Sequence, residues 1–179
     1  EKIGNIQPDL LMSVTPTFSY KNIFLSALFD MKFGGDIVSV SEAIATYYGT
    51  AQRTEKRDNL IFPGVHDDGT PNTQAISARQ YYQSIGGEQA VAEEFIYDAS
   101  FIKLKEISLG YSFPKQILKK TPFTALKVSF VGRNLCYLLK HTPGTSPEGG
   151  FDTSMFSQAI DFTSVPYSRT LGFSVSVGF

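Results

Sequence analysis

The end of the chain, from position 167 to position 179, alternates between apolar and small residues. Thr, Gly and Ser occupy the even positions from 170 to 178. The apolar residues on the other parity are Tyr167, Leu171, Phe173, Val175, Val177 and Phe179. Such period-two alternation predicts a β-strand with one apolar face. A strand that crosses a bilayer at a tilt needs about 9–11 residues, so this segment is long enough to do so.

The make-up of the two faces separates a membrane strand from the half-buried strand of a soluble sandwich. A solvated sheet face usually carries Lys, Glu and Thr, which keep the strand soluble and discourage edge pairing. Here that face carries Ser and Gly, and the strand closes on the aromatic Phe179. The six apolar residues are therefore predicted to face lipid, and with Phe179 they resemble the C-terminal assembly signal of outer-membrane barrels. The soluble sandwich remains the alternative.

Four further segments show strand-like alternation and are predicted as strands. They span positions 10–20, 23–33, 101–113 and 126–138. Pro16 interrupts the first segment, because proline cannot donate a ladder hydrogen bond. In the third segment, Ile102 and Leu104 lie on the opposite parity to Ile107 and Leu109. A β-bulge, or a stretch of strand projecting beyond the bilayer, would account for this change of phase.

The connections between the predicted strands are alternately short and long. Lys21-Asn22 and residues 114–125 form short turns, whereas residues 34–100 and 139–166 form long loops. Antiparallel pairing then places both turns on one side and both loops on the other, as in transmembrane barrels with short periplasmic turns and long extracellular loops. Aromatic residues near the two ends of the strands predict two interfacial bands. They are Tyr20, Tyr111 and Phe113 near the turns, and Phe33, Phe101 and Tyr167 near the loops.

Together these features predict an all-β fold, an antiparallel segment of a transmembrane β-barrel with long extracellular loops. Five strands cannot close a barrel, because an open edge in lipid leaves unsatisfied backbone groups that cost several kcal/mol each. Known single-chain barrels begin at about eight strands. We therefore expect residues 1–179 to be the C-terminal part of a longer barrel polypeptide.

The composition of the chain excludes several other classes of protein. Of 179 residues, 42% are hydrophobic, 13% are aromatic and 18% are charged. That balance excludes a disordered chain, and no run reaches the roughly 18 consecutive apolar residues of a spanning helix. The net charge of −1 gives no electrostatic basis for nucleic-acid binding. The single cysteine, Cys136, cannot form an internal disulfide.

We predict no catalytic, cofactor-binding or metal-binding residues, since the chain lacks the nucleophile-elbow, zinc-protease, P-loop and dinucleotide motifs. The first long loop is predicted to contain two short helices, one from Ser41 to Tyr48 and one from Ser77 to Ile85. Glu93-Glu94 is interpreted as a solvated helix face. The candidate contact residues of the loop are Tyr47, Tyr48, Arg79, Tyr81 and Tyr82. Packing of these side chains against neighbouring loops is the simpler alternative.

Five short motifs follow one another along nearly the whole chain. They lie in Ile3–Asp9, Tyr20–Asp36, Ala99–Tyr111, Gly132–Leu135 and Pro166–Phe179. In order and spacing they resemble the I-G-N-x-x-P-D, Y-K-n-f…G-G-D, s-f-x-R-L-k-n-i-t-L-G-Y, g-x-N-L and final-strand motifs of one family. The chain thus resembles the C-terminal barrel region of the SusC/RagA family of TonB-dependent outer-membrane transporters.

Two positions depart from the family pattern. Lys103 stands where Arg is usual, which keeps the positive charge but loses a bidentate donor. In Gly144–Glu148, Ser146 replaces the acidic residue of a G-x-D-P-E motif, so no contact role of that acid is carried over.

The resemblance implies a barrel of about 22 strands in the bacterial outer membrane, with no enzymatic activity. It implies a plug domain and a TonB box upstream of Glu1, energy supplied through the TonB complex, and a SusD-like surface lipoprotein. The cargo would be glycan or peptide oligomers, and the loop tyrosines would be candidate contacts for cargo or lipoprotein. Two other classes stay open: a soluble β-sandwich binding module, and a non-transporting outer-membrane barrel such as an adhesin or autotransporter domain.

Overall fold

A computed structural model of the chain describes residues 3–61, 64–87, 90–150 and 157–179. Residues 62–63, 88–89 and 151–156, which belong to the two predicted long loops, lie outside the described residues. The chain divides into two compact units, which are considered separately below. The sheet unit comprises Gln7–Gly35, Ala99–His141 and Pro166–Phe179, and the loop unit comprises Glu1–Ile6, Asp36–Asp98 and Thr142–Val165.

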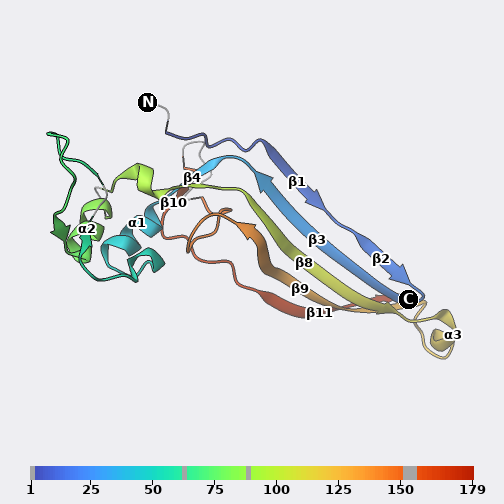
Figure 1. The fold of residues 1–179 in the computed structure, drawn as a ribbon. Coiled ribbons are helices and arrows are strands. Elements are labelled where there is room, and N and C mark those ends of the chain that lie inside the picture. The colour runs from blue at the N-terminus through green and yellow to red at the C-terminus, as the bar shows by residue number, and fades with distance from the viewer. Residues whose placement is uncertain (1–2, 62–63, 88–89, 151–156) are drawn as a thin grey trace. The chain divides into compact units, whose positions relative to one another are not determined.

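The sheet unit is one twisted antiparallel sheet (Figure 1). Its strands are β1 (Leu10–Val14), β2 (Thr17–Tyr20), β3 (Ile23–Phe33), β8 (Phe101–Ser112), β9 (Ala125–Lys140) and β11 (Thr170–Gly178). The order across the sheet is β1-β3-β8-β9-β11, and β2 also pairs with β3. A single-turn helix, α3 (Lys115–Leu118), lies between β8 and β9. The prediction of an all-β antiparallel fold is confirmed.

Pro16 divides the first predicted strand into β1 and β2. Its carbonyl oxygen accepts a hydrogen bond of 3.1 Å from the backbone N–H of Ala27 on β3, but its nitrogen has no hydrogen to donate in return. The ladder is therefore interrupted at this one place and resumes at Thr17, opposite Ser26. The two short strands thus extend along a single partner, β3.

A β-bulge in β8 confirms one of the two explanations for the change of hydrophobic phase. Leu28 of β3 is paired with Glu106, whereas the next residue, Phe29, is paired with Leu104. Lys105 is the additional residue. Because of this insertion, Leu104 lies on the same face of the sheet as Ile107, although the two differ in parity.

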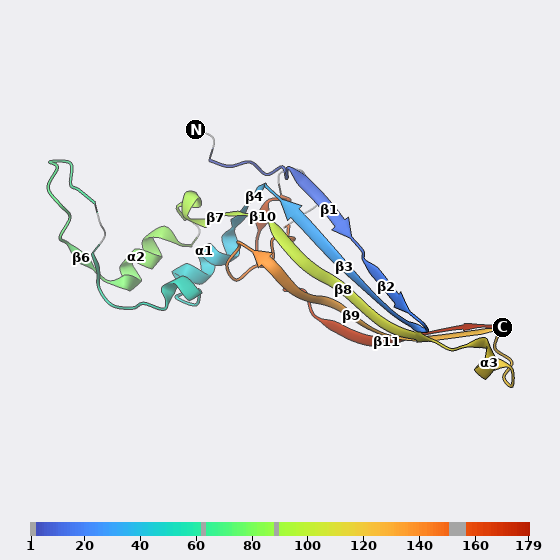
Figure 2. The same cartoon turned by 45° about the vertical axis from the view of Figure 1, so that its right-hand side comes forward.

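The loop unit combines short strands and short helices (Figure 2). Its elements are β4 (Asp36–Ser39), α1 (Val40–Tyr47), the 3-10 helix η1 (Gln52–Thr54), β5 (Leu60–Ile61), β6 (Ala75–Ile76), α2 (Ala78–Ile85), the 3-10 helix η2 (Ala92–Phe95), β7 (Ile96–Asp98) and β10 (Ile160–Asp161). β4 pairs in parallel with β10 and antiparallel with β7, and β5 pairs with β6. No helix among the described residues is long and apolar enough to span a membrane.

Both helices of the loop unit begin at a capping serine. Ser77 accepts a hydrogen bond of 3.2 Å from the N–H of Gln80, and α2 ends at Gly86, as predicted. The cap of α1 is Ser39 and not the predicted Ser41, because the Ser39 hydroxyl oxygen accepts from the N–H of Glu42 at 3.1 Å. The Ser41 hydroxyl oxygen instead accepts from the N–H of Thr163 at 2.7 Å.

A small hydrophobic core holds these helices together. Ala43 of α1, Ile85 of α2 and Phe95 of η2 are buried in it, and tyrosines pack around its edge. Phe95 retains only 1% of its accessible surface. The loop unit therefore has a packed interior that fixes where its remaining side chains can lie.

Candidate functional site

One face of the sheet unit carries continuous rows of apolar side chains. The rows run across β3, β8, β9 and β11 through directly paired residues. Successive rows are Ile23, Tyr111, Val128 and Val175; then Leu25, Leu109, Phe130 and Phe173; then Ala27, Ile107, Gly132 and Leu171. Within the second row the rings of Phe130 and Phe173 meet in a T-shaped arrangement, with centroids 5.6 Å apart.

This apolar face is open. Leu171, Phe173, Val175 and Phe179 expose 65%, 79%, 61% and 86% of their surfaces. The described residues of the sheet unit contain no second sheet that packs on them, and they form one layer only. A soluble sandwich would bury such a face against its second sheet. An apolar area of this extent requires an apolar environment, which is the arrangement predicted for a lipid-facing surface.

The opposite face of the same sheet is polar and carries internal ion pairs. Nε of Arg133 lies 2.8 Å from Oε2 of Glu106, its cross-strand neighbour. Nζ of Lys105 lies 2.7 Å from Oδ2 of Asp30, whose other oxygen accepts a hydrogen bond of 2.6 Å from the hydroxyl of Ser13. Barrel interiors are polar in this way, with apolar side chains outside.

The predicted aromatic band near the turns has several contacts. Tyr111 and Phe113 form a T-shaped pair with centroids 5.1 Å apart, and Phe179 lies 5.6 Å from Phe123. Tyr20 is paired with Ile23, which is in turn paired with Tyr111, so all three lie at one level of the sheet.

In the predicted band near the loops, Phe101 does not lie on the apolar face. Phe101 is paired with Lys32 and Lys140, lies on the polar face, and is only 5% exposed. Tyr167 precedes β11, and its ring centroid lies 4.8 Å from Nζ of Lys103. Lys103 is only 3% exposed, and the ring faces of Tyr137 and Tyr167 contribute to stabilising its buried charge.

Four of the five candidate loop residues line one cavity. Tyr47, Tyr48, Arg79 and Tyr82 contribute to a cavity of about 630 Å³ whose walls come from α1 and α2. Tyr47 and Tyr48 also line a second cavity of about 610 Å³. Their rings meet edge to face, with centroids 5.2 Å apart and planes at 82°. The two tyrosines therefore form a wall shared by both cavities.

The fifth candidate, Tyr81, lies elsewhere. It packs on the core of Ala43, Ile85 and Phe95 and does not line either cavity. Burial, followed by the negative charge of Glu94, raises the pKa of the Tyr81 phenol above its ordinary value, so the phenol is neutral at physiological pH. In the structure, Tyr81 packs on the core of the loop unit itself.

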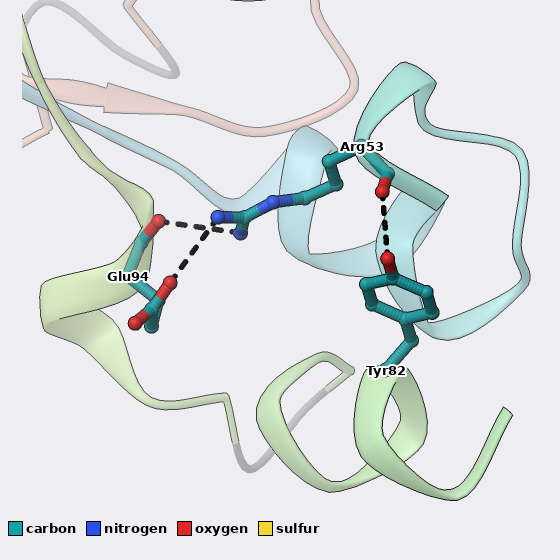
Figure 3. Close-up of polar contacts among 3 residues, drawn as sticks. All are labelled: Arg53, Tyr82 and Glu94. Atoms are coloured by element: carbon teal, nitrogen blue, oxygen red, sulfur yellow. Dashed lines mark hydrogen bonds and ion pairs between the residues drawn. The ribbon is translucent and has the colours of Figure 1, made fainter. Parts of the chain in front are cut away.

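Arg53 holds the cavity wall in place (Figure 3). Its backbone carbonyl oxygen accepts a hydrogen bond of 2.8 Å from the hydroxyl of Tyr82. Its guanidinium forms an ion pair of 3.2 Å with Glu94. The guanidinium also lies 5.1 Å from the centroid of the Phe95 ring. Glu94 lies on the exposed side of η2, as the interpretation of Glu93-Glu94 as a solvated helix face predicts, and its ion pair with Arg53 also joins η2 to η1. Nothing in the sequence pattern links Arg53 to a residue so distant along the chain.

Two buried polar side chains lie close to the cavity wall. Glu42 of α1 is 5% exposed, and desolvation raises the pKa of its carboxyl group, an effect that the nearby Arg53 partly offsets. Thr46 lines the cavity and is fully buried, and its hydroxyl has no hydrogen-bond partner within the described part of the chain. An unsatisfied buried hydroxyl costs about 1–3 kcal/mol. In the described ranges no group of three His, Cys, Asp or Glu side chains is placed to hold a metal ion.

The sequence of this chain is similar to parts of two TonB-dependent receptors. No family model matches the chain. It is 26% identical over 182 residues to TonB-dependent receptor P3 of Formosa agariphila, covering 99% of this chain and 17% of the receptor. TonB-dependent receptor P39 of the same organism is 24% identical over 177 residues, again with 99% and 17% covered. The chain therefore spans less than a fifth of the length of these receptors.

Solved structures show the same fold. The RagAB peptide importer in its open-open state matches with a TM-score of 0.64 and 15% identity, over 97% of this chain and 17% of that one. Its closed-closed state matches with a TM-score of 0.65 and 17% identity, over 97% and 18%. With the ordered motifs and the two-faced sheet, the two receptors support the predicted resemblance to the SusC/RagA family of TonB-dependent receptors, and the solved structures share the fold of this chain.

Proposed function

We propose that the chain is the C-terminal part of an outer-membrane barrel of about 22 strands that imports oligomeric nutrients. The observation that carries the proposal is the open apolar face of β11 and its neighbours, opposite a polar face with internal ion pairs. A sheet of this kind is stable only when lipid covers one face and a protein interior or aqueous channel meets the other.

The proposed energy source and partner proteins are those that the resemblance to the SusC/RagA family implies. A plug and a TonB box upstream would couple transport to the TonB complex. The loop unit would lie at the extracellular side, where a SusD-like surface lipoprotein would cap the barrel. The RagAB structures are of a peptide importer, and glycan or peptide oligomers are both candidate cargo classes for this chain.

Cysteine labelling of the complete receptor in outer-membrane vesicles tests the orientation of the sheet. Cys136 is first replaced by Ser, and single cysteines are then placed at Phe173 or at the adjacent Ser174. We expect Phe173→Cys to resist a charged, water-soluble maleimide and to react with a lipid-soluble one. Ser174→Cys provides the matched control on the other face and should have the reverse preference. Preferential labelling of Phe173→Cys from water would contradict the proposal.

Transport is tested in cells that carry the complete receptor or lack its gene. Fluorescent oligosaccharide and oligopeptide pools are supplied separately, and intracellular label is measured. We expect uptake of one pool to require the receptor and to stop when a protonophore dissipates the proton gradient. Receptor-independent uptake of both pools would exclude import, while leaving a non-transporting barrel possible.

A further inference from the structure

The cavity between α1 and α2 carries positive charge that is not neutralised internally. Arg57 and Arg79 both line it, and no Asp or Glu is present among the described lining residues. Arg79 forms no ion pair within the described part of the chain. Arg57 only donates a long hydrogen bond of 3.4 Å to the carbonyl oxygen of Gly49. Two guanidinium groups are therefore available to a ligand that carries negative charge.

The same cavity presents flat aromatic surfaces. Tyr48 is 74% exposed and Tyr47 is 39% exposed, an unusual degree for large aromatic side chains with no covering element. Tyr82 donates its hydroxyl hydrogen to Arg53, which fixes the orientation of its ring in the wall. Rigid aromatic faces of this kind suit a ligand with apolar faces and polar edges, as a pyranose ring has.

Polar groups complete the lining. Gln83 lies beside the tyrosines, whereas Thr54 is buried and its hydroxyl donates a hydrogen bond of 2.6 Å to the carbonyl oxygen of Ala51. Thr46 also lines the cavity, and its buried hydroxyl has no hydrogen-bond partner among the described residues. The volume of about 630 Å³ is within the range of about 300–1,000 Å³ for small-ligand sites. The aromatic rings of the lining offer faces on which the apolar faces of sugar rings can stack, while the hydroxyl groups of a sugar can contact Gln83 and the arginines.

We infer that this cavity binds an acidic oligosaccharide, in which a carboxylate or sulfate group contacts Arg57 and Arg79 while sugar rings stack on Tyr47 and Tyr48. The inference rests on the proposed import function and deepens it by naming the cargo class. The position of the site on an extracellular loop suits capture of the ligand before it enters the barrel.

Binding to the purified complete receptor tests the inference by titration calorimetry. The ligands are oligogalacturonate, a sulfated oligosaccharide, a neutral malto-oligosaccharide of equal length and a poly-aspartate peptide. We expect one or both acidic sugars to bind, with an affinity that falls as salt is raised. Oligogalacturonate and the sulfated oligosaccharide distinguish a carboxylate from a sulfate. The malto-oligosaccharide tests a sugar without charge, and poly-aspartate tests negative charge without a sugar. Equal binding of the neutral sugar, or binding of the peptide alone, would overturn the inference.

Matched substitutions locate the site. Arg57→Gln and Arg79→Gln should each weaken acidic-sugar binding by about tenfold, since each removes one charge-assisted contact. Lys56→Gln is the control, because Lys56 is an exposed cation next to Arg57 that does not line the cavity. Tyr48→Ala should also weaken binding, whereas Tyr81→Phe should not. Unchanged affinity in both arginine variants would assign the ligand to another place.

The same variants keep this inference separate from the proposed function. If the receptor imports oligomers in a TonB-dependent manner but the Arg57→Gln variant binds acidic sugar as tightly as the wild type, only the binding role of the cavity is contradicted. A receptor that binds acidic sugar through the cavity but imports nothing would contradict the proposed function alone.

Discussion

The ring of Phe24 on β3 covers Gly110, its cross-strand partner on β8. A side chain at Gly110 would place its Cβ 2.2 Å from two ring atoms of Phe24 and 2.8 Å from Cβ of Ser129 on β9. Nζ of Lys127 lies over the Phe24 ring, 3.6 Å from its centroid. The absence of a side chain at Gly110 therefore lets an aromatic ring lie flat on the polar face and bind a cation there.

Gly110→Ala is expected to destabilise the barrel. The added methyl group would displace Phe24 or the strand itself, and overpacking of this kind costs about 1–3 kcal/mol. The measurement is the urea midpoint of the complete receptor refolded into lipid vesicles, read by the loss of heat-resistant migration on a gel.

Gly172→Ala is the matched control for Gly110→Ala. Gly172 lies in β11 of the same sheet, and an added Cβ there meets no atom within 4 Å. This change should be neutral or stabilise by up to about 1 kcal/mol, because alanine loses less backbone entropy on folding. If both alanine variants had the same midpoint, contact with Phe24 would not explain the glycine.

Phe173→Arg should destabilise the barrel through its lipid-facing side. Phe173 is 79% exposed in the central apolar row. An Arg facing lipid near the bilayer midplane costs about 2–4 kcal/mol. The measurement is again the urea midpoint in vesicles, together with the amount of folded receptor in outer-membrane fractions.

Ser174→Arg introduces the same charge one residue further along. Its side chain faces the polar side of the sheet, where water and ion-pair partners are available. We expect at most about 1 kcal/mol of change, as for most surface substitutions. A larger loss for Ser174→Arg than for Phe173→Arg would reverse the assignment of the two faces.

Glu42 should make the local stability of the loop unit depend on pH. Burial raises its pKa in the folded unit above the ordinary value of 4.5, so the folded form holds the proton more tightly than the unfolded form. The stabilising contribution of protonated Glu42 is complete below the ordinary pKa and is lost as pH rises through the raised value. Protection of α1 should therefore decrease with rising pH.

Hydrogen exchange of the α1 amides, corrected for intrinsic rates, measures this effect between about pH 5 and pH 8. Glu42→Gln should flatten the pH dependence and slow exchange at neutral pH, because the amide cannot ionise. Glu93→Gln changes an exposed acid in the same unit and serves as the control. An identical slope in the wild type and Glu42→Gln would show that Glu42 does not govern local opening.

Much of the sheet could be predicted because its causes are local. Alternation along β11 follows from the two-residue repeat of a strand, so Leu171, Phe173 and Val175 had to share a face. The change of phase between Leu104 and Ile107 required an additional residue, which the structure provides at Lys105. The cap at Ser77 and the end of α2 at Gly86 are likewise short-range features.

The loop site could be predicted only as a list of residue types. The sequence places Tyr81 and Tyr82 side by side, and both pack on the core, yet only Tyr82 lines the cavity and donates a hydrogen bond to Arg53. Helix geometry alone cannot predict which of these neighbouring tyrosines lines the cavity, because this depends on which elements pack on each side of α2.

The sequence by itself determined a two-faced antiparallel sheet with long loops on one side, because strand alternation and turn length depend on residues that are close together in the sequence. Only the tertiary structure decided that Phe101 lies on the polar face, that Lys103 is buried between Tyr137 and Tyr167, and that Arg53 joins Tyr82 to Glu94. Each of these depends on contacts between residues far apart along the chain, and a residue's own neighbours do not specify which distant partner will compensate its charge.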